Sequence, residues 1–92
     1  MAWQLNELAS LHWRCWSGEW AVFDVGSGQT HQMDTFTATT LMMLEAGPLD
    51  LLALGAQVAD ELQLPNNAEL SSVLMNTLEQ LVSVGLIESI AP

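Results

Sequence analysis

Four side chains in the first part of the sequence could do chemistry: His12, Cys15, His31 and Asp34. A thiol beside an imidazole is a nucleophilic pair, and two imidazoles with one carboxylate can bind zinc or iron. The spacing selects neither chemistry. His12, His31 and Asp34 include no pair four residues apart, and Cys15 lies in a Trp-rich strand pattern typical of a small buried thiol. We therefore expect no catalytic residue, no metal site and no cofactor.

The charge balance excludes other classes of partner. Eleven acidic residues stand against one basic residue, Arg14, which gives a net charge of −10. Such a surface repels phosphate backbones and anionic membranes, so we expect neither nucleic acid nor membrane as a partner. The start of the sequence has no signal-peptide pattern, and no apolar run approaches the length of a membrane span. The expected location is cytoplasmic.

The first secondary-structure elements expected along the chain, which position these side chains, are strands. Alternating and β-branched patterns predict strands over residues 11–16, 19–25 and 30–33, joined by turns at Ser17-Gly18 and at residues 26–29. Connections this short predict an antiparallel meander in chain order. Its short third strand should then lie at an edge, and residues 1–8 are expected to form a loose arm.

The sequence pattern of the remaining two thirds of the chain predicts three helices. Asp34 and Asp50 are expected to cap the first two, and Asn66 with Glu69 resembles a capping box for the third. Gly85 fits the position that ends the third helix, with the next residue packing back on it. The apolar stripe expected on that helix comprises Leu70, Val73, Leu74, Leu78, Leu81 and Val82. We therefore expect residues 1–92 to form one α+β domain, compatible with a winged-helix-like arrangement.

An unpaired third strand followed at once by a helix can form a cleft in which an extended peptide adds as a fourth strand. The alternative is an edge that is merely short and covered by another segment. A third possibility is pairing with the same edge of a second copy, so monomer and homodimer both stay open.

The ordered pattern along the chain resembles the PqqD family, named for the pyrroloquinoline-quinone biosynthesis protein D. The resemblance is carried by residues 24–33 (DVGSGQTHQM), the Gly47-Pro48-Leu49 break and the terminal Gly85-Leu86-Ile87-Glu88, and it covers about residues 3–89. The branch that it resembles most is described as peptide chaperones of the HPr-kinase-related A system.

This resemblance implies a non-enzymatic, winged-helix-like domain that binds the leader segment of a ribosomally made precursor peptide and presents it to a modifying enzyme. It places the leader along the third strand, at Thr30, His31, Gln32 and Met33, with the third helix as the other wall. Met75, at the edge of the stripe of that helix, is the helix residue expected to contribute. The alternative function is a protein-interaction or dimerisation module with no peptide substrate.

Overall fold

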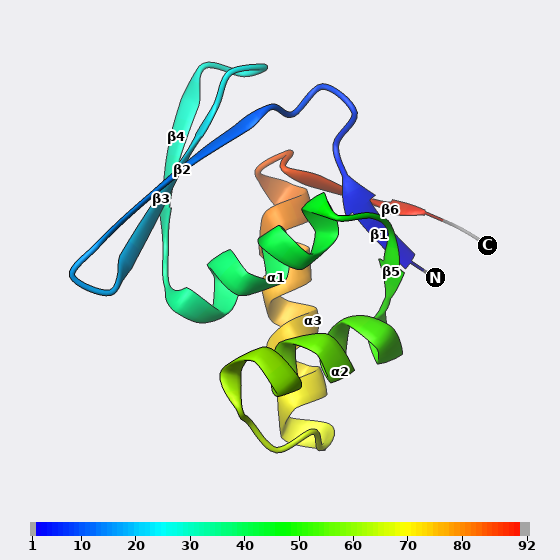
Figure 1. Ribbon diagram of the computed structural model, residues 1–92. Helices are drawn as coiled ribbons and strands as arrows, with labels where there is room; N and C mark the ends of the chain where they lie inside the picture. The colour runs from blue at the N-terminus through cyan, green and yellow to red at the C-terminus, as the bar shows by residue number, and fades with distance from the viewer. Residues whose placement is uncertain (1, 91–92) are drawn as a thin grey trace.

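The computed structural model describes residues 2–90 and confirms an α+β fold with three helices and antiparallel sheets (Figure 1). The elements are β1 (Ala2–Leu5), β2 (Leu11–Trp16), β3 (Glu19–Asp24), β4 (Gln29–Met33), α1 (Thr35–Glu45), β5 (Leu49–Asp50), α2 (Leu51–Leu62), α3 (Ala68–Ser83) and β6 (Ile87–Ile90). Within the described part of the chain, no helix has the length and apolar character required to cross a membrane.

The predicted meander is confirmed, with strand order β2-β3-β4 and antiparallel pairing throughout. The turn between β2 and β3 has positive φ at Ser17 (50°) and Gly18 (76°), the conformation of a two-residue type I′ hairpin. Strand β3 is central, as its apolar residues on both faces predict, and β4 ends the sheet on one side.

A second sheet, of order β5-β1-β6, replaces the loose arm expected for residues 1–8. Strand β1 is its centre and pairs with β6 over four positions, from Ala2 opposite Ile90 to Leu5 opposite Ile87. The physical reason is burial: the Trp3 side chain is only 5% exposed and anchors the N-terminal strand in the core. The residues before Ala2 and after Ile90 lie outside the described part of the chain.

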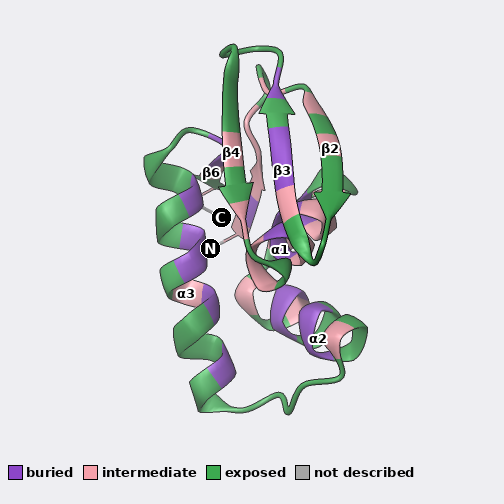
Figure 2. Cartoon of the chain, turned by 90° about the vertical axis from the view of Figure 1, so that its left-hand side faces the viewer, coloured by how far each residue is buried: buried purple, intermediate pink, exposed green. Residues whose placement is uncertain are grey.

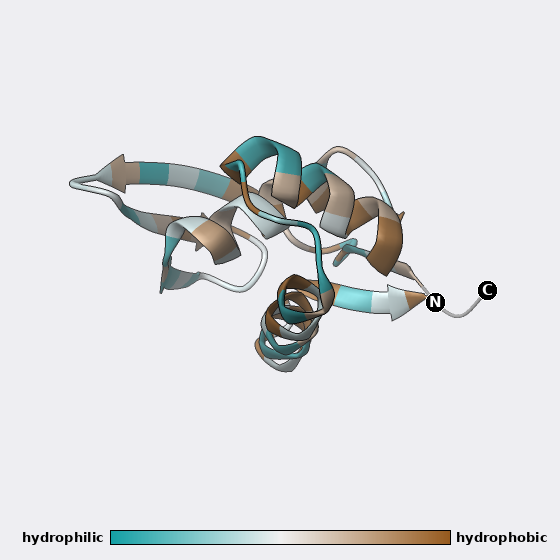
Figure 3. Cartoon of the chain, turned by 90° about the horizontal axis from the view of Figure 1, so that it is seen from below, coloured by the Kyte–Doolittle hydropathy of each residue, from teal (hydrophilic) through white to brown (hydrophobic). Residues whose placement is uncertain are grey.

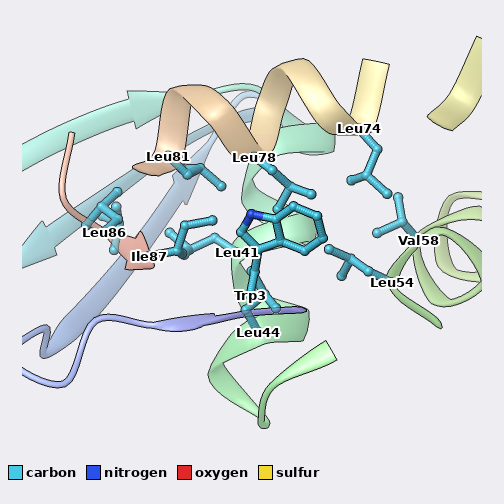
Figure 4. Packing of buried hydrophobic residues seen from close by; sticks show 11 residues of the cluster. Trp3, Leu41, Leu44, Leu54, Val58, Leu74, Leu78, Leu81, Leu86 and Ile87 are labelled. Atoms are coloured by element: carbon cyan, nitrogen blue, oxygen red, sulfur yellow. The ribbon is translucent and has the colours of Figure 1, made fainter. Parts of the chain in front are cut away.

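The hydrophobic core lies between the three helices and the β5-β1-β6 sheet (Figure 4). Trp3 is surrounded there by side chains of α1 and α3 and by Ile87 of β6. The meander contributes Val22, and Trp13 packs edge-to-face on Trp20 with ring centroids 5.9 Å apart. The meander is therefore attached to the core by one face only.

The caps of α1 and α2 are confirmed, whereas the cap of α3 is shifted by one residue. Asp34 and Asp50 each accept a hydrogen bond from the backbone N–H three residues later, at 2.8 and 2.7 Å. For α3 the capping side chain is Asn67, which accepts from the Leu70 N–H at 3.0 Å, and not Asn66. Glu69 then occupies the second helical position, too early for the predicted capping box.

The end of α3 and most of its stripe follow the sequence pattern. Gly85, at φ 82°, donates to the Val82 carbonyl while Leu86 donates to the Leu81 carbonyl, the bond pair of a Schellman motif. Leu70, Leu74, Leu78 and Leu81 are buried as expected. Val73 and Val82 are exposed, so the buried stripe is narrower than predicted.

Asp24 ties the meander to the segment that joins it to β1. Its Oδ1 accepts hydrogen bonds from the backbone N–H groups of Ser10 and Gly26, both at 3.0 Å. The Ser10 bond above all lowers the pKa of the Asp24 carboxyl from its ordinary value of 3.8, although burial acts in the opposite direction. Gly26 must remain glycine, because a Cβ there would lie 1.9 Å from the Leu8 carbonyl oxygen. These contacts fix the hairpin that carries β4.

Candidate functional site

The backbone of β4 presents unpaired groups at the sheet edge. In a two-residue hairpin the residues flanking the turn form a hydrogen-bonded pair, here Trp16 and Glu19. Bonding alternates along the strand, so Glu19, Ala21 and Phe23 bond to β2, whereas Trp20, Val22 and Asp24 bond to β4. The β4 partners of these last three residues are Met33, His31 and Gln29. The N–H and C=O groups of Thr30 and Gln32 therefore point away from the sheet.

The side chains of β4 alternate in the same way. His31 and Met33 are half-buried on the inner face, whereas Thr30 and Gln32 are exposed on the outer face. Beside the inner face, Gln80 and Leu81 of α3 and Val84, the residue that caps the C-terminus of this helix, line a hollow of about 140 Å³ together with residues 31–33. Figure 2 shows β4 as the meander strand on the side of α3. Strand β2, the other edge, lies on the far side of β3.

A second hollow, of about 290 Å³, lies near the N-terminal half of α3. It is lined by Phe36, Leu64, Pro65, Asn67, Glu69, Leu70 and Val73. Val73 and Val84 are three helical turns apart and share one side of α3, which is seen nearly end-on in Figure 3. We call the two hollows and this side of the helix the α3 groove. Both valines are nearly half exposed, at 45% and 48%, so the groove offers apolar surface to solvent.

The structure brings three of the five expected site residues together. His31, Gln32 and Met33 line the hollow beside α3. Thr30 presents its backbone at the same edge, but its side chain lines a different hollow on the outer face of the meander. Met75 lines neither part of the α3 groove and packs, half-buried, against the hydrophobic core. Nine residues separate it from Val84, which at about 100° per residue places it on the opposite side of α3.

The residues considered for catalysis or metal binding are not assembled. His12 projects from the outer face of the meander and His31 from the inner face. Cys15 is exposed, contrary to the expected buried thiol, and β3 separates its strand from that of His31. Two strand spacings amount to about 10 Å, too far for a thiol–imidazole hydrogen bond. Residues 2–90 contain no cluster of three metal-ligating side chains.

One polar atom of the groove has no partner. The Nε2 atom of His31 is buried and makes no hydrogen bond with the described residues. The sequence pattern also did not single out the helix residues that line the groove, above all Gln80 and Val84. A signal existed in the eleven-residue spacing of Val73 and Val84, but Val73 fitted the core stripe equally well.

Comparisons with known proteins support the fold. No protein-family model matches the chain, and no curated protein matches it. Among solved structures, the chain is similar to "TbiB1 in Complex with the TbiA(beta) Leader Peptide", with a TM-score of 0.70 over 97% of this chain and 99% of that one. The two sequences are 15% identical. The likeness therefore establishes a shared fold, and the fold is that of a protein whose structure contains a leader peptide.

Proposed function

We propose that this chain is a non-enzymatic peptide chaperone that binds the leader of a ribosomally made precursor peptide and presents it to a modifying enzyme. The leader would add to β4 as a fourth strand and pack its side chains into the α3 groove. The observation that carries the proposal is the combination of an unpaired strand edge with an apolar helix flank beside it. The fold shared with a leader-peptide complex supports the same reading.

The edge offers two residues for main-chain pairing. The N–H and C=O groups of Thr30 and Gln32 provide four hydrogen-bonding positions, which would set the register of the leader without reading its sequence. Selectivity would come from side chains at alternate leader positions, which point toward the groove. Met33, Leu81 and Val84 make that part of the groove apolar, and so we expect apolar leader residues two positions apart.

The net charge of the chain further restricts which leader sequences could bind. The chain carries a net charge of −10, and Glu69 lies in the lining of the second hollow of the groove. An acidic leader would be repelled, whereas a neutral or basic leader would be attracted over about a Debye length. The contribution to chemistry would be proximity, because a tethered precursor reaches effective concentrations of about millimolar order at the enzyme.

The test is an amide-detected NMR titration of the labelled chain with synthetic leader halves of short peptides encoded beside its gene. We expect the largest shifts at the amides of Thr30 and Gln32 and along the groove side of α3. A scrambled peptide of the same composition is the control. Equal affinity for the scrambled peptide would overturn the proposal.

Sedimentation and amide exchange of the free chain test the alternative of a dimerisation module. If β4 pairs with β4 of a second copy, sedimentation of the free chain would give a dimer and the Thr30 and Gln32 amides would resist exchange before any peptide is added. A monomer with fast-exchanging amides at these two positions is the expected result.

A further inference from the structure

The outer face of the meander carries a third hollow, which the proposed function does not use. It is an open depression of about 520 Å³, lined by His12, Trp13, Arg14, Ala21, Phe23, Val25 and Thr30. Ala21 forms its floor: although it is on the outer face, its side chain is 8% exposed because larger neighbours surround it. Figure 2 looks onto this face of the three strands, with α1 behind them.

The hollow contains the one cationic side chain of a chain with eleven acidic residues. Arg14 is exposed on β2, opposite Ala21, and His12 lies two residues away, about 7 Å along the same strand. None of the side-chain hydrogen bonds within residues 2–90 uses the Arg14 guanidinium. No carboxylate lines the hollow, and Glu19 lies on the same face but nearer the turn. The positive charge is thus available to an external anion.

Apolar side chains surround this charge. Phe23 is 42% exposed, and Trp16 and Val25 are exposed on the same face. Exposed aromatic residues beside an arginine are the composition enriched at the centres of protein interfaces. A free inorganic anion would use the guanidinium but leave these apolar side chains in water. The occupant that satisfies both features is a protein segment with a carboxylate between apolar side chains.

We infer that the outer face of β2–β4 docks such an acidic, apolar segment of a partner protein. The docked segment would occupy the hollow around Ala21, with its carboxylate on Arg14 and an apolar side chain against Phe23. This surface lies on the face of the meander opposite the α3 groove, so a partner could dock while a peptide occupies the β4 edge. The remainder of the surface, being acidic, would orient the partner by repelling the same segment elsewhere.

The probe is an acetylated and amidated pentapeptide in which Glu alternates with Leu, with a Lys-for-Glu counterpart as the matched control. Amide-detected NMR can follow the Arg14 Nε–H directly, because the chain has one arginine and that signal is unambiguous. At millimolar concentration the Glu peptide should shift the Arg14 Nε–H and the amides of Ala21 and Phe23. The Lys peptide should leave all three unchanged.

Two variants test whether binding of the Glu peptide depends on Arg14. Arg14→Gln, at an exposed position that should not disturb folding, should weaken binding of the Glu peptide about tenfold, the effect of losing one charged hydrogen bond. Leu52→Ser, on an 81% exposed residue of α2, should leave the affinity unchanged. Shifts confined to the β4 edge, an equal response to the Lys peptide, or an equal response to inorganic phosphate would each overturn the inference. Because the Arg14 signal and the Thr30 and Gln32 amides are read separately, its failure is distinct from failure of leader binding.

Discussion

The two three-stranded sheets of this chain have different structural roles. The β5-β1-β6 sheet packs Trp3 and Ile87 into the core, and both side chains are almost completely buried. The β2-β3-β4 meander buries one face in part and leaves the other face and the β4 edge to solvent. One sheet holds the fold together, and the other presents surface.

This difference shows where binding energy can come from in a chain of 92 residues. A domain of this size needs nearly all of its large apolar side chains for its core. The meander nevertheless keeps Phe23, Val25 and Trp16 exposed, and α3 keeps Val73 and Val84 exposed beside it. Apolar surface that does not contribute to folding is available for partners.

The largest expected effect comes from the first sheet. Trp3→Ala removes the side chain that anchors β1 and should lower the free energy of unfolding by about 3–5 kcal/mol. Trp16→Ala, the same substitution on the exposed face of the meander, should change it by less than about 1 kcal/mol. Urea denaturation followed by Trp fluorescence measures both. Equal losses would contradict the division between the two sheets.

Asp24→Ala should have the next largest effect, because it leaves the N–H groups of Ser10 and Gly26 without their acceptor. We expect a loss of about 2 kcal/mol, against no measurable loss for Asp60→Ala on the exposed side of α2.

The pH dependence of stability has a definite sign. The folded pKa of Asp24 lies below its ordinary value of 3.8, so its contribution is complete above that pH and is lost as the pH falls through the folded pKa. As the pH falls through 3.8 and below, the difference in stability between the unsubstituted chain and Asp24→Ala should therefore shrink. A constant difference across that range would show that the charge of Asp24 does not stabilise the fold.

Leader binding should be weakened more by a carboxylate placed inside the α3 groove than by the same charge placed elsewhere on the chain. Val84→Glu places a carboxylate in the hollow beside β4 and should weaken leader binding about tenfold, by lost apolar contact and desolvation. Leu52→Glu adds the same charge on α2, away from the groove, and serves as the matched control. Isothermal titration with the same leader peptide compares them. Similar losses of affinity in both variants would show that the change in net charge, and not the groove, causes the effect.

Local features of the fold were predictable from the sequence because their causes are local. The Ser17-Gly18 turn, the Asp34 and Asp50 caps and the Gly85 terminus each depend on a few neighbouring residues. The second sheet was not predictable in this way. Its strands have four, two and four residues, and β1 pairs with β6 across nearly the whole chain, from Ala2 to Ile90.

The candidate site likewise has one part that the sequence predicts and one part that it does not. Strand order follows from short turns, so the β4 edge was predicted together with Thr30, His31, Gln32 and Met33. The wall of the groove depends on which side of α3 its neighbours leave uncovered. Helical periodicity treats Val73 and Leu74 alike, and only the packing of α1 and α2 exposes the first and buries the second. Met75, expected because it borders the apolar stripe, packs against the core and lines neither hollow of the groove.

The most direct test of strand addition compares one substitution at the two edges of the meander. Gln32→Pro removes an outward N–H from β4, and Cys15→Pro removes an outward N–H from β2, where no helix groove lies alongside. Circular dichroism first verifies that both variants are folded. Gln32→Pro should then weaken leader binding at least about tenfold, and Cys15→Pro should leave it unchanged. Equal affinities in the two variants would contradict leader binding at the β4 edge.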